Sequence, residues 1–164
     1  LVTGGARSGK SRYAETLVQA VDPPWAYIAT AESRDAEMEE RIRHHRARRG
    51  SSWTTVEAPL ALVEALEATE DKAARLVDCL TLWLSNAMEA EADLAGERDR
   101  LSTYLAATSV PTVLVTNEVG MGLVPTNALA RRYRDEAGRL NQVVADTADH
   151  VVFMVSGLPM AVKG

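Results

Sequence analysis

The sequence predicts an α/β protein: a mostly parallel β-sheet with helices on both faces, in a single domain spanning residues 1–164. Three observations favour this fold class. Short β-rich runs alternate with helical stretches along the chain. Several of these runs are almost entirely apolar, as expected for strands that are buried on both faces. A glycine-rich phosphate-binding motif follows the first run directly and opens the first helical stretch.

The expected strands are the short apolar runs Leu1–Thr3, Trp25–Ala29, Thr54–Val56, Arg75–Cys79, Thr112–Thr116 and His150–Val155. The expected helices lie between them, at Ser11–Val21, Arg34–Arg49, Leu60–Thr69, Leu82–Glu91, Arg98–Thr108 and Thr126–Ala148. Proline and glycine residues separate the two kinds of segment. The stretch Ala90–Arg98 is expected to be a solvated helix end and loop.

Composition narrows the functional classes. Lys and Arg total 18 against 23 Asp and Glu, a formal net charge of -5, which argues against a general nucleic-acid binder. The lone cysteine, Cys79, excludes an internal disulfide and a multi-cysteine metal site, and it suggests a reducing compartment, so we expect a cytoplasmic protein. The sequence shows no apolar run long enough for a membrane span and no secretory signal. We expect a few residues of the first strand to lie upstream of Leu1.

The clearest motif is a phosphate-binding loop with the pattern G-x-x-x-x-G-K-[ST]. It is formed by Gly4, Gly5, Ala6, Arg7, Ser8, Gly9, Lys10 and Ser11. The glycines allow the backbone N–H groups to wrap an anion, and the helix that follows adds its positive end. Lys10 can reach the β- and γ-phosphates, and the Ser11 hydroxyl can bind Mg²⁺. The alternative is a glycine-rich turn that matches by chance.

A phosphate-binding loop of this kind needs a carboxylate on a neighbouring strand to hold Mg²⁺ through water. Asp78 ends the apolar run ARLVD and is the acidic residue of that run, so we expect it to serve the metal together with Ser11. The alternative is an aspartate that caps a turn at the end of a strand. Cys79 is then a small core residue with no reactivity implied.

Two adjacent histidines lie in the segment DAEMEERIRHHRARR. Helical spacing places His45 on the face shared by Met38 and Ile42, and it places His44 on a polar face. His45 could therefore face the protein body and attack a phosphorus atom, and Arg46, Arg48 and Arg49 could contact phosphates. The alternatives are a hydrogen-bonded structural histidine and solvated arginines.

The last third of the chain offers weaker candidates. Asn117 and Glu118 follow an apolar strand, so they could contact substrate, metal or attacking water, or they could form local hydrogen bonds in a turn. In the helix that follows, Arg131–Asp135 and Arg132–Glu136 have the spacing of surface ion pairs. Gly138 in the same helix suggests a close packing contact, because glycine costs about 1 kcal/mol there relative to alanine.

These elements together resemble the bifunctional adenosylcobinamide kinase/adenosylcobinamide-phosphate guanylyltransferase family of cobalamin biosynthesis. The matching stretches occur in family order: LVTGGARSGKSRYAE, YIATAE, DAEMEERIRHHRARR, WTTVEAP, VDCLTLWLSN, VLVTNEVGMGLVP, RRYRDEAGRLNQ and VSGLP. The resemblance implies a RecA-like P-loop fold and two reactions. ATP or GTP phosphorylates adenosylcobinamide, and GTP then donates GMP to the product through a guanylylated histidine, which is His45 by the family motif.

The resemblance also implies a set of nucleotide contacts and an assembly. The contacts are Gly4, Gly5, Ala6, Arg7, Ser8, Gly9, Lys10, Ser11, Ala29, Thr30, Ala31, Arg46, Ala47, Arg48, Arg49, Glu57 and Asp78, with Mg²⁺ at Ser11 and Asp78. Asp78 stands where the family often has glutamate. The family resemblance further implies a homotrimer with sites near the subunit boundaries, acting on small molecules and not on nucleic acid. Two other readings remain: a small-metabolite P-loop kinase with a structural His45, and a RecA-like ATPase that acts on DNA or on partner assembly.

Overall fold

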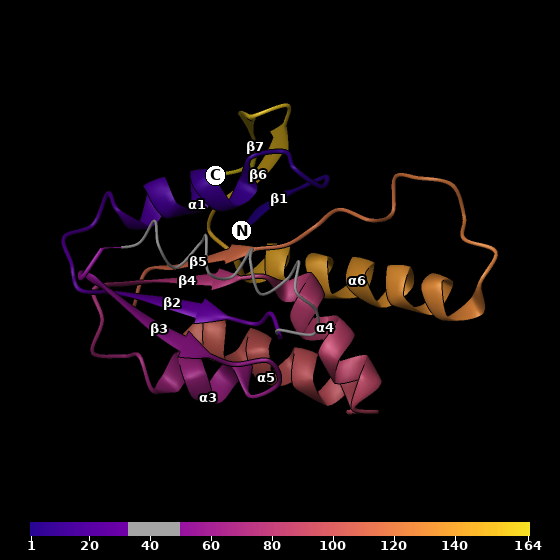
Figure 1. The fold of residues 1–164 in the computed structure, drawn as a ribbon, viewed down its shortest axis with the longest axis horizontal. Helices are drawn as coiled ribbons and strands as arrows, with labels where there is room; N and C mark the ends of the chain where they lie inside the picture. Colours follow the sequence, from indigo (N-terminus) through magenta and orange to yellow (C-terminus); the bar gives the residue numbers. More distant parts are fainter. Residues whose placement is uncertain (33–49) are drawn as a thin grey trace.

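The computed structural model describes residues 1–32 and 50–164, and the predicted helix Arg34–Arg49 lies outside them. The strands of this part of the chain form one seven-stranded sheet, in the order β3-β2-β4-β5-β1-β6-β7 (Figure 1). They are β1 (Val2–Gly4), β2 (Trp25–Ala29), β3 (Trp53–Glu57), β4 (Ala74–Asp78), β5 (Thr112–Val115), β6 (Val151–Val155) and β7 (Leu158–Lys163). The pairs among β1 to β6 are parallel, and β7 runs antiparallel to β6. The predicted mostly parallel sheet is confirmed.

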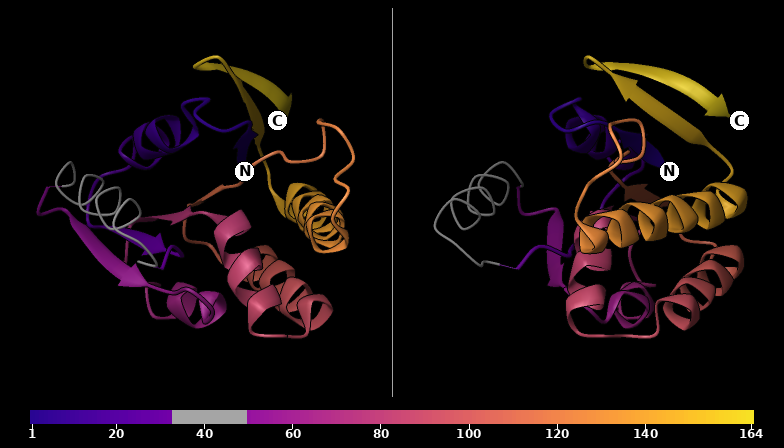
Figure 2. Two further views of the ribbon diagram at one scale, coloured as in Figure 1. Left: turned by 45° about the vertical axis from the view of Figure 1, so that its right-hand side comes forward. Right: turned by 90° about the vertical axis from the view of Figure 1, so that its right-hand side faces the viewer.

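Helices cover both faces of this sheet, as predicted. They are α1 (Lys10–Val18), α3 (Leu62–Glu67), α4 (Leu80–Glu89), α5 (Leu94–Ala107) and α6 (Ala128–Thr147). Figures 1 and 2 show α1 on one face of the sheet and the other four helices together on the opposite face. This arrangement leaves the carboxyl ends of the parallel strands at one edge, where binding sites form in open α/β sheets.

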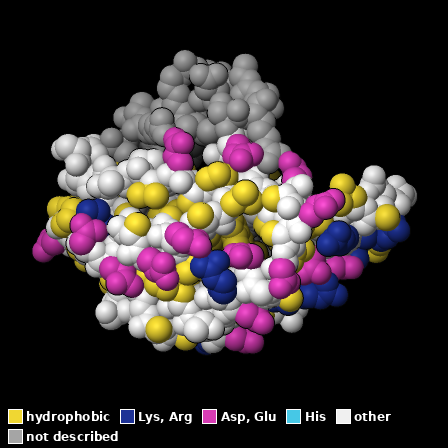
Figure 3. Space-filling model, turned by 90° about the horizontal axis from the view of Figure 1, so that it is seen from below, with side chains coloured by type: hydrophobic (Ala, Val, Ile, Leu, Met, Phe, Trp, Pro, Cys, Tyr) yellow, Lys and Arg dark blue, Asp and Glu magenta, His cyan; other side chains and the backbone are white. Residues whose placement is uncertain are grey.

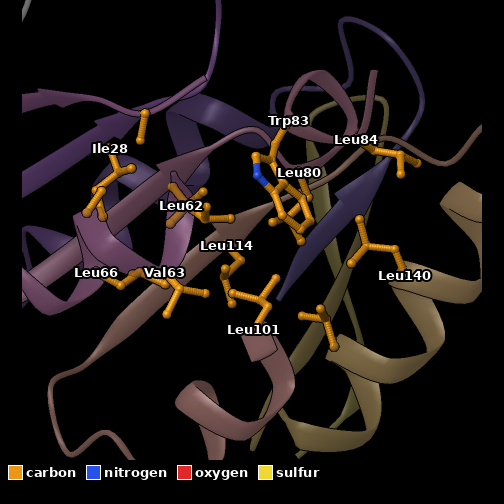
Figure 4. Packing of buried hydrophobic residues seen from close by; sticks show 14 of the residues in the cluster. Ile28, Leu62, Val63, Leu66, Leu80, Trp83, Leu84, Leu101, Leu114 and Leu140 are labelled. Carbon is orange, nitrogen blue, oxygen red and sulfur yellow. The ribbon is translucent and has the colours of Figure 1, made fainter. Parts of the chain in front are cut away.

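Two hydrophobic clusters fill the spaces between the sheet and its helices. The larger cluster packs Ile28, Val77 and Leu114 of the sheet against α3, α4, α5 and α6 (Figure 4). The smaller cluster packs other strand side chains, including Leu76 and Val115, against α1. Successive residues of β4 thus enter opposite clusters, which explains why this strand reads as a continuous apolar run.

The sheet order corrects one expectation about the site. Asp78 was expected on a strand next to the one that precedes the phosphate-binding loop. In the structure β5 lies between β1 and β4, so one strand separates that loop from Asp78. The loop after β5 therefore begins between the two strand ends that carry the nucleotide motifs.

The ends of several elements, and one whole element, differ from the sequence prediction. Strand β7 was not predicted; each of its residues is exposed, so no buried face marks it in the sequence. The segment Ala90–Arg98 was predicted as a helix end and loop, but α5 begins at Leu94. This start is fixed by Asp93, whose side chain accepts a hydrogen bond from the Gly96 N–H at 3.2 Å. The loop expectation is therefore wrong for the second half of that segment.

Two expectations about α6 are also wrong. The predicted pairs Arg131–Asp135 and Arg132–Glu136 do not form. Arg131 instead donates to the carbonyl oxygens that precede the helix, Pro125 O at 3.0 Å and Thr126 O at 2.6 Å. Glu136 is paired with Arg98 and Arg139, at 3.3 and 2.6 Å. Gly138 has no close packing contact, because a Cβ built on it would meet nothing within 4 Å.

A buried arginine lies at the amino end of β4, away from the phosphate-binding loop. Arg75 has no exposed surface. Its guanidinium donates to Thr112 Oγ1, Leu66 O, Tyr104 Oη and Thr108 Oγ1, at 2.5 to 3.1 Å. The Tyr104 hydroxyl donates in turn to the Glu70 carboxylate at 3.1 Å. Arg75 therefore ties β4 to α3, α5 and β5 through neutral acceptors, and a carboxylate lies one hydrogen bond further away.

The surface carries charges of both signs. Figure 3 shows Asp and Glu side chains spread over the face seen from below, with Lys and Arg side chains and hydrophobic side chains among them. None of the helices within residues 1–32 and 50–164 has the length and the apolar content required to cross a bilayer.

Candidate nucleotide-binding site

The phosphate-binding loop joins the end of β1 to the start of α1. Three of its residues have positive φ: Gly4 at 145°, Arg7 at 55° and Gly9 at 93°. A chain that alternates into the left-handed region turns successive N–H groups toward one concave side. Helix α1 begins at Lys10, so its positive end also faces this concavity. The backbone therefore has the form that is expected of an anion-binding loop.

Lys10 lies buried at the mouth of this loop. The residue is 6% exposed, and its Nζ donates to Gly5 O at 2.6 Å. Burial lowers the pKa of Lys10 below the ordinary lysine value, and the nearby Cys79 and Asp78 act in the opposite direction. The ammonium group is thus hydrogen-bonded to the backbone of the loop itself. When a nucleotide binds, the group can donate to a phosphate oxygen in place of the Gly5 carbonyl oxygen.

The carboxylate predicted for the metal lies at the end of β4. Asp78 is half-buried, and the Tyr27 hydroxyl donates to its Oδ2 at 3.0 Å. Its charge is close enough to raise the pKa of Lys10 against the effect of burial. The sequence reasoning missed Tyr27, because the two residues lie 51 positions apart and their contact follows only from strand pairing.

The residues present fit a Mg²⁺ ion that is held mainly by its nucleotide. Within the described ranges no group of three or more His, Cys, Asp or Glu could hold a metal on its own. Magnesium in phosphate-transfer sites needs only one or two protein oxygens beside phosphate oxygens and water. The Ser11 hydroxyl and the Asp78 carboxylate are donors of that kind.

Thr30 follows β2 and joins it to the end of β4. Its hydroxyl donates to Cys79 O and accepts from the Cys79 N–H, both at 2.7 Å, on the far side of the cis peptide Asp78–Cys79. Asn86 of α4 donates to Thr30 O at 2.9 Å. Thr30 is completely buried, so its side chain positions the end of β4 beside Asp78. A bond donated by this hydroxyl to a ligand would replace its bond to Cys79 O.

Cys79 itself is buried, and its side chain packs in the cluster beneath α1, which confirms its predicted role as a small core residue. Burial and the adjacent Asp78 charge raise the pKa of the thiol. Its Sγ lies 3.1 Å from Thr81 Oγ1. Burial and the neighbouring carboxylate therefore disfavour the thiolate form of Cys79.

The side chains of Asn117 and Glu118 both have protein partners. Asn117 donates to Thr81 Oγ1 at 2.7 Å, which fastens the end of β5 to the start of α4. Glu118 accepts a bond from the Gly120 N–H, and its own N–H donates to Gly4 O at 3.0 Å. The structure thus shows both side chains in hydrogen bonds within the protein, of which the Asn117 contact is tertiary and not local, and a contact with substrate stays a prediction. The loop after β5 is anchored on the phosphate-binding loop.

The remaining predicted nucleotide contacts divide into two groups. Glu57, Ala29 and Asp78 lie side by side, because Ala29 pairs with Glu57 of β3 and with Asp78 of β4 in the sheet. Ala31 follows Thr30 at the same edge. His45, Arg46, Ala47, Arg48 and Arg49 lie outside the described residues. The structure therefore assembles one row of the predicted site and leaves the histidine–arginine group as a prediction.

Comparisons with known proteins give a consistent result. A family model described as cobinamide kinase/cobinamide phosphate guanyltransferase matches residues 1–162. The bifunctional adenosylcobalamin biosynthesis protein CobP of Pseudomonas aeruginosa is 49% identical, over 100% of this chain and 96% of that protein. The corresponding CobU proteins of Salmonella typhimurium and Escherichia coli are 44% and 40% identical, each covering 99% of this chain and 98% of that protein.

The solved structures agree on the fold. A KaiC-like protein from Pyrococcus horikoshii superposes with a TM-score of 0.52 at 14% identity, over 93% of this chain and 70% of that one. A second protein from the same archaeon gives 0.53 at 9% identity, over 99% of this chain and 84% of that one. At such low identity these two matches bear on the fold alone, whereas the family model and the three bacterial relatives cover nearly the whole chain. The chain therefore belongs to the cobinamide kinase/cobinamide phosphate guanyltransferase family.

Proposed function

We propose that this chain is a bifunctional enzyme of cobalamin biosynthesis. It phosphorylates adenosylcobinamide with ATP or GTP, then transfers GMP from GTP to adenosylcobinamide phosphate, giving adenosylcobinamide-GDP and pyrophosphate. One observation carries the proposal: Lys10 is buried in the mouth of an anion-binding loop with the Asp78 charge beside it, in a chain whose family carries both activities in its description. These small molecules are its partners, and nucleic acid is not.

In the kinase step, the aminopropanol hydroxyl oxygen attacks the γ-phosphorus and the nucleoside diphosphate leaves. Phosphoryl transfer of this kind needs mainly positioning and charge neutralisation. The N–H groups between Gly4 and Ser11 hold the phosphates, and Lys10 neutralises charge on the transferred group. Mg²⁺, held by Ser11 and Asp78, supplies further charge neutralisation when bound.

In the transferase step, a neutral imidazole nitrogen of His45 attacks the α-phosphorus of GTP and pyrophosphate leaves. A phosphate oxygen of the acceptor then displaces the imidazole, which restores the free histidine and forms the new diphosphate bond. Arg46, Arg48 and Arg49 follow His45 in the sequence and bind phosphate oxygens in this proposal. The backbone around Ala29, Thr30, Ala31 and Ala47, together with the Glu57 side chain, completes the nucleotide contacts.

We also propose that the active protein is a cytoplasmic homotrimer. Support for an assembly comes from two groups of exposed apolar side chains. Leu158, Met160 and Val162 of β7 are 53 to 72% exposed, and Met121, Leu123 and Val124 of the loop after β5 are 65 to 97% exposed. Surface of this kind is typical of protein interfaces. Sedimentation of the purified chain tests the assembly.

The deciding experiment for the function compares two radiolabels. [α-³²P]GTP should label the protein covalently and [γ-³²P]GTP should not, because the nucleotidyl group stays on the protein while pyrophosphate leaves. His45→Ala should abolish the label, and the adjacent His44→Ala serves as the matched control that retains it. Labelling that is lost only in His44→Ala would contradict the assignment of the nucleophile. A wild-type protein that takes no α-label would favour a simple kinase.

A further inference from the structure

A hydrogen bond between neighbouring strands holds the carboxylate that ends β4. Tyr27 of β2 lies opposite Leu76 of β4, and Ala29 lies opposite Asp78. Tyr27 and Asp78 are therefore diagonal neighbours on the same face of the sheet, at a separation that only a long side chain spans. The Tyr27 hydroxyl crosses this diagonal and donates to Asp78 Oδ2 at 3.0 Å.

The ring that carries this hydroxyl is fixed by packing. Tyr27 is 5% exposed and belongs to the cluster beneath α1. Its ring meets Trp53 of β3 edge-on, with centroids 6.3 Å apart and planes at 74°. Trp53 in turn packs against Trp25, at 5.2 Å between centroids. A ring held by two strands and a helix keeps its hydroxyl at one point, so the Asp78 carboxylate is held there too.

We propose that Tyr27 is a positioning residue, which orients the Asp78 carboxylate for the metal-bound nucleotide. The bond to Tyr27 engages Oδ2 and leaves Oδ1 to accept a bond from water on the cation. The aspartate side chain is one methylene shorter than glutamate and has one fewer torsion to restrain, so a single donor is sufficient to fix its orientation. This inference rests on the proposed function, because it assumes that Asp78 serves Mg²⁺.

The alternative is a bond that only stabilises the sheet. A structural bond would change the free energy of unfolding in Tyr27→Phe and would leave the response to metal as it is. A positioning bond would change how strongly Mg²⁺ improves nucleotide binding. The useful quantity is therefore the ratio of nucleotide affinities with Mg²⁺ and with EDTA, measured within one variant, since a general loss of affinity cancels in it.

The experiment titrates a fluorescent GDP analogue, which carries no γ-phosphate to transfer, into wild type, Tyr27→Phe, Asp78→Asn and the double variant. We expect Tyr27→Phe to lower the Mg²⁺/EDTA affinity ratio by about 3- to 10-fold, the range that one typical hydrogen bond contributes. Asp78→Asn should lower the ratio at least as far. In the Asp78→Asn background, Tyr27→Phe should have no additional effect, because the carboxylate it orients is gone.

Tyr104→Phe is the matched control. It removes a tyrosine hydroxyl from the Arg75 network at the opposite end of β4, so it should lower the melting temperature and leave the ratio at the wild-type value. If the Mg²⁺/EDTA affinity ratio fell in Asp78→Asn and stayed at the wild-type value in Tyr27→Phe, the metal assignment would stand and the Tyr27 proposal would be overturned. A full additional effect of Tyr27→Phe in the Asp78→Asn background would also overturn it. If Asp78→Asn kept the wild-type Mg²⁺/EDTA affinity ratio, the assignment of Asp78 to the metal would be overturned, and the role of Tyr27 with it.

Discussion

The carbonyl oxygen of Met154 occupies the space where a side chain on Gly4 would have to lie. The two residues are partners in the β1–β6 ladder, and a Cβ built on Gly4 would be 2.6 Å from Met154 O. The φ of Gly4 is also positive, at 145°. Glycine is required here by the sheet as well as by the phosphate-binding loop. A substitution at Gly4 therefore tests the packing of β1 against β6.

Gly4→Ala should lower the free energy of unfolding by about 2 kcal/mol or more, because the strand must shift away from a backbone atom. Urea unfolding followed by circular dichroism measures this loss. Gly5→Ala is the control, since a Cβ there meets nothing within 4 Å and φ is not positive. It should stay within about 0.5 kcal/mol of wild type. Equal stabilities for the two variants would contradict the packing of β1 against β6.

Lys10→Met should abolish both nucleotide-dependent activities without loss of stability, because the charged side chain is buried in the free protein. Its pH dependence gives a second test. The pKa of Lys10 is lowered on folding, so between that value and the ordinary lysine value the unfolded chain binds more protons than the folded chain. The stability of wild type relative to Lys10→Met should therefore rise with pH through this range. A relative stability that falls with pH would show that the ammonium group is not desolvated.

Gly138→Ala should raise the free energy of unfolding by about 0.5–1 kcal/mol, because alanine is the better helix former and a Cβ there meets nothing within 4 Å. Thermal unfolding measures the gain. Gly157→Ala is the contrasting variant: its Cβ also meets nothing within 4 Å, but its φ is +85°, so it should lose stability. If Gly138→Ala were less stable than wild type, the result would support the close packing contact that the sequence suggested.

Arg75→Lys should cost about 2–4 kcal/mol of stability, because an ammonium group cannot reproduce the planar set of donors and leaves buried acceptors without a bond. Arg100→Lys, at a side chain that is 47% exposed, should change stability by less than about 0.5 kcal/mol. GTP binding per folded molecule should be normal in both variants, since Arg75 lies at the amino end of β4. Loss of nucleotide affinity in folded Arg75→Lys would contradict that separation.

Local patterns predicted most of the fold and failed in recognisable places. Apolar runs such as ARLVD and TVLV located the buried strands, because each of their faces enters a hydrophobic cluster. Strand β7 lacks that signal, since its residues are exposed and their pairing with β6 is supplied by the backbone. The charges of α6 were paired by i,i+4 spacing alone, whereas Glu136 pairs with Arg98 of α5 and Arg131 donates to the Pro125 carbonyl ahead of the helix.

The candidate site also divides into residues that local patterns predict and residues that only tertiary contacts reveal. The phosphate-binding loop and Asp78 could be predicted, because their chemistry depends on residue type and on the strand–loop–helix context. The side chains that hold them in place could not. Tyr27, Thr30 and Asn86 act on residues 49 to 56 positions away, through a sheet register that no local pattern encodes.

The position of β1 inside the sheet, between two strands that follow it in the chain, has a consequence for how the protein is made. Its neighbours are β5 and β6, and the turn after β6 donates from Gly157 N–H to Ser8 O at 3.1 Å. The strand that leads into the phosphate-binding loop therefore lacks one of its two partners until β6, about 150 positions further along the chain, has been made. We expect newly made polypeptide to acquire its full affinity for GTP only after β6 and the turn that follows it have been released.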